Sequence, residues 1–183
     1  LAETASVFGE MLTFQSLLER NKNDHTKRKI MIASKVEDML NTVVRQVAFH
    51  EFESSVHAKR RSGELSPDEI GNIWMNIQEK SLGPAIKLND DYRVFWTYIP
   101  HFIHSPFYVY AYAFGDCLVN SLYAVFKEHS SEFSEKYIDM LKAGGTLRHK
   151  ELLAPFELDA SDPNFWRKGL SLIENLIDEL DQD

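Results

Sequence analysis

The sequence is poor in cysteine, in positive charge and in long apolar runs, and each shortage argues against a class of protein. A single cysteine, Cys117, excludes an internal disulfide and fits a reducing cytoplasm. The formal net charge is −8, and no basic stripe with interleaved aromatics is present, so a nucleic-acid partner is not expected. No apolar run approaches the roughly 20 residues that span a bilayer. We therefore expect a cytoplasmic protein with neither nucleic acid nor a membrane as a partner.

Strand signals are almost absent, whereas apolar residues recur at helical spacing along most of the chain. The pattern predicts an all-α fold, and 183 residues suffice for one domain or for one lobe of a larger protein. Residues 88–105 are the least regular and are predicted to form an ordered loop. Ser66-Pro67-Asp68-Glu69 predicts a capping box that starts a helix. The expected helices cover about residues 2–20, 26–61, 67–82, 107–129, 131–143 and 150–153, with a last one from Asp162-Pro163.

Glu3, Ser6 and Glu10 follow one another at spacings of three and four, so they lie on one stripe of the first expected helix. Two carboxylates with a hydroxyl between them suit a metal ligand supported by a second carboxylate. A solvated acidic face is the other interpretation, and spacing alone favours it.

His50-Glu51-Phe52-Glu53-Ser54 begins like the zinc-binding His-Glu-x-x-His helix, but Ser54 stands where the second histidine belongs. His57 lies seven residues after His50, two helical turns away, which is too far for joint ligation. We interpret these histidines as core or surface residues and predict no metal site in this segment.

The segment from Pro100 to Tyr112 carries two histidines, His101 and His104, and three tyrosines in thirteen residues. Tyr108 and Tyr112 are four apart and would share a helical face, whereas Tyr110 would point elsewhere. Imidazoles and phenols can donate hydrogen bonds to the oxyanion of a tetrahedral intermediate. An aromatic core stripe is the competing interpretation of such a run.

Two segments together resemble the oligoendopeptidase F and thimet oligopeptidase relatives among the zinc peptidases. One is Glu3-x-x-Ser6-x-x-x-Glu10, which resembles the family's segment downstream of His-Glu-x-x-His. The other runs from Ile99-Pro100-His101-Phe102 through Pro106 to Gly115 and resembles the family's His/Tyr segment. Gly144-Gly145, Glu151-Leu152-Leu153 and Phe165-Trp166 also match in order, so the resemblance covers the whole of residues 1–183.

The resemblance implies the C-terminal helical lobe of a zincin-type metallopeptidase with an enclosed substrate channel. It makes Glu3 a zinc ligand, with Ser6 and Glu10 supporting it from outside the ligand set. His101, Tyr108 and Tyr112 become catalytic residues, and His104 and Tyr110 substrate-binding residues, although the register among the three tyrosines stays open.

The sequence contains no His-Glu-x-x-His, so the resemblance places both histidine ligands and the general-base glutamate N-terminal to Leu1. The implied partners are short peptide substrates and the missing N-terminal part of the same polypeptide. We expect the isolated chain to be inactive and to bind zinc poorly. A non-catalytic helical module that binds a peptide or small ligand is the main alternative, and a homodimerising helical domain is a weaker one.

Overall fold

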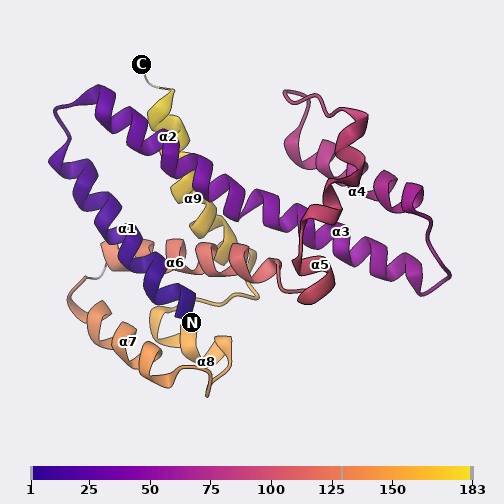
Figure 1. Ribbon diagram of the computed structural model, residues 1–183. Helices are drawn as coiled ribbons and strands as arrows, with labels where there is room; N and C mark the ends of the chain where they lie inside the picture. The colour runs from indigo at the N-terminus through magenta and orange to yellow at the C-terminus, as the bar shows by residue number, and fades with distance from the viewer. Residues whose placement is uncertain (1, 129, 182–183) are drawn as a thin grey trace. The chain divides into compact units, whose positions relative to one another are not determined.

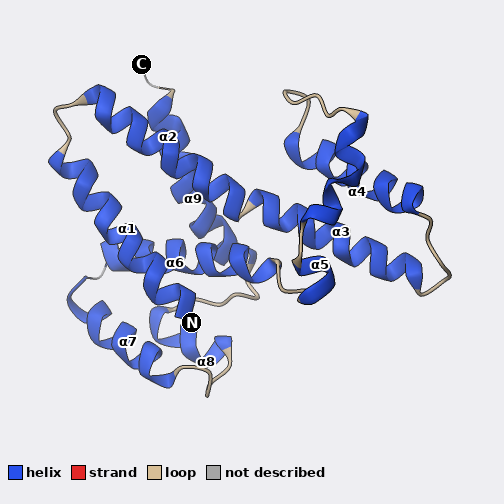
Figure 2. Ribbon diagram, viewed as in Figure 1, coloured by secondary structure: helices blue, strands red, loops and turns tan. Residues whose placement is uncertain are grey.

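The computed structural model describes residues 2–128 and 130–181, without the side chains of residues 2, 3 and 130. The regular structure in this described part is entirely helical, which confirms the predicted all-α class (Figure 2). None of the described helices has the length and apolar character that a membrane crossing requires. The elements are α1 (Ala2–Arg20), α2 (His25–Thr42), α3 (Val44–Arg60), α4 (Pro67–Leu82), η1 (Asp90–Tyr98), α5 (His101–His104), α6 (Tyr110–Glu128), α7 (Ser130–Ala143), α8 (His149–Leu153), η2 (Ala154–Phe156) and α9 (Pro163–Leu180).

The start of α4 follows the predicted capping box. The Ser66 hydroxyl accepts a hydrogen bond from the Glu69 backbone N–H at 3.3 Å, and the Glu69 carboxylate accepts one from the Ser66 N–H at 2.8 Å. Pro67 occupies the first turn, where its missing N–H costs nothing. The local sequence is therefore enough to predict this helix start.

Three predicted segments differ from the structure. The single helix over 26–61 is interrupted at Val43, in a run of β-branched residues that disfavours helix. The loop over 88–105 contains the 3₁₀ helix η1 and the short helix α5. The helix expected from Phe107 begins at Tyr110, because Phe107 adopts a left-handed φ of 59°. Tyr108 therefore lies in a turn and not on a helical face with Tyr112.

The chain folds as two compact units, one formed by residues 1–39 and 114–183 and the other by residues 40–113. In the first unit α1 lies beside α6 and α7 (Figure 1). The buried ring of Phe8 contacts Phe133 and Tyr137 of α7 at centroid distances of 5.5 and 4.7 Å, and Phe126 of α6 at 6.1 Å. The Tyr137 hydroxyl also donates to the carbonyl of Thr4 at 3.4 Å. These contacts hold the first turns of α1 in place.

The second unit is built around Trp74 of α4, which is 1% exposed. Its indole ring contacts Phe49 and Phe52 of α3 at 5.5 and 5.1 Å, and Phe102 of α5 at 6.4 Å. Val109, buried in the same core, ends the turn that precedes α6. Aromatic packing thus fixes α5 and the start of α6 against α3 and α4.

Cys117 in α6 is buried, as expected for a small apolar side chain. Burial raises the pKa of its thiol to about 12. The thiolate form that a nucleophile needs is therefore strongly disfavoured at neutral pH.

Candidate functional site

His101, Tyr108 and Tyr112 come together in the second unit, and we call these three side chains the His/Tyr cluster. His101 begins α5, Tyr108 lies in the turn over residues 105–109, and Tyr112 lies in the first turn of α6. The cluster is therefore assembled from two helices and the turn between them, all within one short stretch of sequence.

The three rings of the His/Tyr cluster contact one another. The His101 and Tyr108 rings are parallel, with centroids 6.2 Å apart, and Tyr112 stands nearly perpendicular to both at 5.7 and 5.4 Å. A hydrogen bond joins His101 Nε2 and the Tyr112 hydroxyl at 3.1 Å, and the tautomer of His101 decides which atom donates. Perpendicular and offset ring contacts are the favourable geometries for aromatic side chains.

The members of the His/Tyr cluster differ in exposure. His101 and Tyr112 are half-buried, whereas Tyr108 is 46% exposed. The cluster thus presents one phenol to solvent and holds a second phenol and an imidazole behind it. Such an arrangement can offer O–H and N–H donors to an anionic oxygen that develops beside it.

His104 and Tyr110, the two residues assigned to substrate binding, lie outside the His/Tyr cluster. His104 ends α5 and is exposed. Tyr110 begins α6, is 51% exposed, and its ring meets His50 of α3 edge-on at 5.7 Å. The expectation that Tyr110 points away from Tyr108 and Tyr112 agrees with this placement.

One face of α3 borders the segment over residues 101–112. The spacing of residues in the sequence did not indicate this contact. His50, interpreted from sequence as a core or surface residue, lies beside Tyr110, and its Nε2 is 3.5 Å from the Ser54 hydroxyl. Glu53 is 2% exposed and accepts a hydrogen bond from the Phe107 backbone N–H at 2.7 Å. The periodic recurrence of His50, Glu53 and His57 was the available signal, but only the fold shows what that face contacts.

The Glu3, Ser6 and Glu10 stripe lies on α1 in the first unit. The Ser6 hydroxyl donates to Glu10 Oε1 at 3.4 Å, and both side chains are exposed. Glu3 belongs to the first turn of α1, but its side chain lies outside the described residues. Among the side chains that the structure describes, no three histidines, cysteines or carboxylates converge as a metal site.

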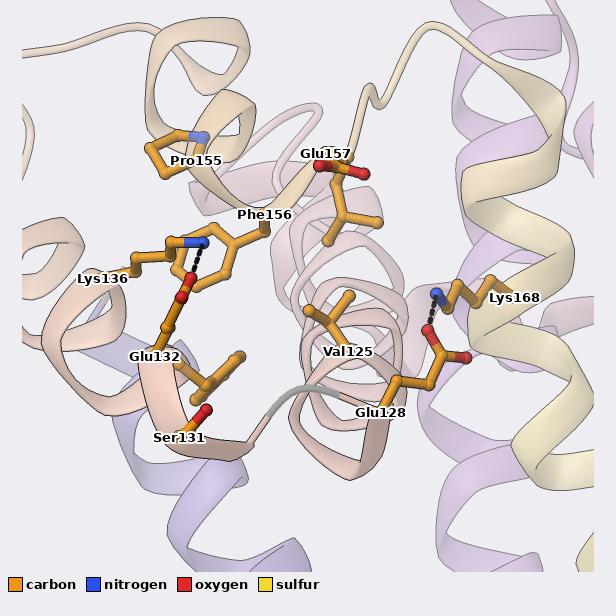
Figure 3. Close-up of a pocket in the computed structure, with 11 residues that line it drawn as sticks. Val125, Glu128, Ser131, Glu132, Lys136, Pro155, Phe156, Glu157 and Lys168 are labelled. Carbon is orange, nitrogen blue, oxygen red and sulfur yellow. Dashed lines mark hydrogen bonds and ion pairs between the residues drawn. The ribbon is translucent and has the colours of Figure 1, made fainter.

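A separate pocket of about 390 Å³ opens in the first unit between α6, α7 and η2 (Figure 3). Its two lysines are engaged in ion pairs: Lys136 Nζ lies 3.4 Å from Glu132 Oε2, and Lys168 Nζ lies 3.3 Å from Glu128 Oε2. None of the described residues that line it is a histidine, cysteine or tyrosine.

The chain is similar to known peptidases over its whole length. Peptidase family M3 matches residues 1–172. Oligopeptidase PepF of Bacillus subtilis (strain 168) is 30% identical over 183 residues, which are 100% of this chain and 27% of that protein. The plasmid-encoded oligoendopeptidase F of Lactococcus lactis subsp. cremoris is 31% identical over 183 residues, again 100% of this chain and 30% of that protein.

The fold gives the same result. The crystal structure of oligoendopeptidase-F from Enterococcus faecium superposes with a TM-score of 0.90 at 26% identity, covering 99% of this chain and 34% of that one. The chain thus spans about 30% of the length of the proteins it matches. The resemblance inferred from the glutamate stripe and the His/Tyr segment is confirmed, and the chain belongs to peptidase family M3.

Proposed function

We propose that this chain is the C-terminal portion of a longer zinc-dependent oligoendopeptidase that hydrolyses peptide bonds in short peptides. Membership of peptidase family M3 supports a peptidase, and the names of the relatives support oligopeptides as substrates. The observation that carries the proposal is the His/Tyr cluster, in which an imidazole and two phenols contact one another and one hydrogen bond joins His101 to Tyr112. A cytoplasmic location remains a prediction from the single cysteine.

Within the His/Tyr cluster, we assign Tyr108 and His101 to the oxyanion of the tetrahedral intermediate. Tyr108 is the most exposed member, so its hydroxyl can reach a substrate carbonyl oxygen. Tyr112 holds the imidazole of His101 through the 3.1 Å hydrogen bond and so fixes its orientation. Donors that are already oriented stabilise the developing charge more effectively than donors that must reorganise.

Zinc is the cofactor that the resemblance implies, and the resemblance assigns one of its ligands, Glu3, to this chain. The side chain of Glu3 lies outside the described residues, and the described side chains form no ligand set among themselves. Ser6 and Glu10, bonded to each other one and two turns further along α1, would support that ligand. When bound, zinc would supply Lewis-acid chemistry for hydrolysis of the peptide bond.

The test of the ligand assignment is Glu3→Gln in the full-length protein, with Glu19→Gln as the matched control. Glu19 lies on the same helix, is exposed, and pairs with Lys22 at 2.6 Å. We expect Glu3→Gln to lose stoichiometric zinc by atomic absorption and at least about 10²-fold in cleavage of a quenched fluorescent peptide. Glu19→Gln should keep both. Full zinc content and activity in Glu3→Gln would reject the assignment.

The isolated chain provides a second test of the same proposal. Because only one of its side chains is assigned as a ligand, it should hold no stoichiometric zinc after washing with a chelator, and it should not cleave the peptide. Tight zinc in the washed chain would contradict the proposed division of ligands. A full-length protein without zinc would instead favour the non-catalytic binding module.

A further inference from the structure

We propose that Glu53 is a positioning residue for the peptidase reaction: its buried carboxylate holds the turn over residues 105–109 in the conformation that places Tyr108 in the His/Tyr cluster. This inference rests on the proposed function. It concerns a residue of α3 that is far in sequence from the His/Tyr segment and that does not itself reach the cluster's exposed phenol.

The turn is held in an unfavourable backbone conformation. Phe107 has φ 59°, in the left-handed region that bulky side chains rarely adopt. Its backbone N–H donates to Glu53 Oε1 at 2.7 Å, a short distance typical of a carboxylate acceptor. A strained residue persists only where its surroundings over-determine it, and such residues concentrate at functional sites. Glu53 is the group that determines the direction of this N–H.

Two histidines flank Glu53 on the same face of α3 and contact the same stretch of chain. The His57 ring lies 4.7 Å from the ring of Phe107, and the His50 ring lies 5.7 Å from the ring of Tyr110. Spacings of three and four residues put all three α3 side chains on one stripe. This face of α3 therefore contacts the turn at the ring and the backbone N–H of Phe107, and it contacts the first residue of α6 at the ring of Tyr110.

Packing alone does not explain why a glutamate is buried at position 53. The side chain is 2% exposed, and its second oxygen, Oε2, has no hydrogen-bond partner among the described residues. A buried oxygen without a partner costs free energy, so an apolar residue would serve a purely structural role better. The contact that compensates for this cost is the hydrogen bond to the turn.

The consequence for the reaction follows from the order of residues along the chain. Phe107 directly precedes Tyr108, so a change in the Phe107 backbone redirects the Tyr108 ring away from His101 and Tyr112. Misplacing a group by about 1 Å can cost about 10²-fold in rate. Because Tyr108 is assigned to the transition state, the loss should fall on kcat and leave KM almost unchanged.

The experiment compares Glu53→Ala, Glu53→Gln and Glu51→Ala in the full-length protein, with kcat and KM measured on a quenched fluorescent peptide. Glu51 is the matched control, because it lies on α3, is exposed, and pairs with Lys80 at 3.6 Å. We expect Glu53→Ala to lower kcat about 10- to 100-fold with KM within about twofold. Glu53→Gln should recover most of kcat, because its amide oxygen can accept the same hydrogen bond. Glu51→Ala should match the unmodified protein.

A double-mutant cycle with Tyr108→Phe separates positioning from general destabilisation. If Glu53 acts through Tyr108, Glu53→Ala should lower kcat by less than about twofold in the Tyr108→Phe background. A normal kcat in Glu53→Ala, or a full additive loss in the double variant, overturns the inference and leaves the proposed function standing. A normal kcat in Tyr108→Phe removes Tyr108 from the proposed function, and the inference falls with it.

Amide hydrogen exchange keeps the test decisive if Glu53→Ala folds poorly. In Glu53→Gln, exchange over residues 105–110 should remain slow, and exchange over α4 should be unchanged. In Glu53→Ala, exchange should quicken over residues 105–110 before it does over α4. Loss of kcat in Glu53→Gln with protected amides over 105–110 would overturn the inference.

Discussion

The Tyr112 hydroxyl lies 3.1 Å from Nε2 of His101, so the first turn of α6 and the first residue of α5 are joined by a side-chain hydrogen bond. The two residues are eleven apart in the sequence and lie in different helices, so helical spacing does not predict their contact. The bond sets the orientation of the imidazole, while the parallel ring of Tyr108 limits its movement on the other side. The three side chains of the His/Tyr cluster thus hold one another in place through contacts of their own.

Tyr112→Phe in the full-length protein should lower kcat about tenfold or more, because His101 loses the group that orients it. KM should change little, since the ring and its contacts remain. The control is Tyr98→Phe, which removes the hydroxyl of a tyrosine in η1 that is 79% exposed. Steady-state kinetics on a quenched peptide measure both. Equal kcat values for the two variants would show that the His101 orientation does not depend on Tyr112.

Tyr110→Ala should have a different kinetic signature. Tyr110 is 51% exposed and contacts His50 and not the His/Tyr cluster, so its assigned role is substrate binding. Loss of an aromatic contact that is equal in the ground and transition states raises KM and leaves kcat unchanged. We expect KM to rise about three- to tenfold, which corresponds to roughly 1 kcal/mol. A fall in kcat at constant KM would move Tyr110 into the catalytic set.

Much of the fold could be predicted from the sequence because capping residues next to the helix boundaries specify where helices begin. Ser66, Pro67 and Glu69 specify the start of α4, and Asp162 with Pro163 specify the start of α9, whose Asn164 N–H donates to the Asp162 carboxylate at 2.9 Å. Both starts lie where the sequence predicts them. The α2–α3 break at Val43 was missed, because the apolar periodicity continues through it.

The contacts of the candidate site were harder to predict than its residues. The resemblance supplied His101, Tyr108 and Tyr112, but helical spacing would have paired Tyr108 with Tyr112 on α6, and the structure instead pairs them across a turn. Phe107, which has a left-handed φ inside this turn, donates its backbone N–H to a carboxylate 54 residues earlier. Helical spacing puts Glu53 on one face with His50 and His57, but nothing in the local sequence indicates what that face contacts, so the bond from Glu53 to the turn could not be predicted before the fold was known.

The approach of α9 to α6 gives a prediction about stability. A Cβ atom at Gly169 would lie 2.8 Å from the Cys117 carbonyl oxygen, a backbone atom that cannot move aside easily. Gly169→Ala should therefore lower the free energy of unfolding by about 1–3 kcal/mol. Gly9→Ala is the control, because Gly9 lies inside α1 and a Cβ there meets nothing within 4 Å. It should raise the free energy of unfolding by about 0.5–1 kcal/mol. Urea unfolding followed by circular dichroism measures both, and equal effects of the two substitutions would contradict the close approach.

Asp116 should make the stability of the first unit depend on pH. Burial raises the pKa of its carboxyl from 3.8 to about 6, and the nearby Lys35 only partly offsets this effect. Because the folded pKa lies above the unfolded one, the unfolded state ionises first as pH rises, and stability falls between about pH 4 and pH 6. The stabilising contribution of the protonated Asp116 carboxyl is fully lost above its folded pKa of about 6. At neutral pH the ionised, buried carboxylate therefore opposes folding.

In the unmodified chain, Asn120 Nδ2 donates a hydrogen bond to the Asp116 carboxylate at 3.1 Å. Asp116→Asn removes the ionisation and keeps an oxygen that can accept this hydrogen bond. The variant should be more stable than the unmodified chain at pH 7.5 by about 1–3 kcal/mol, and the difference should shrink toward zero at pH 4. Asp139→Asn is the control, because Asp139 is exposed on α7 and pairs with Lys142 at 3.2 Å. Urea unfolding at both pH values measures the difference. A less stable Asp116→Asn at pH 7.5 would mean that attraction to Lys35 outweighs the cost of burying the carboxylate.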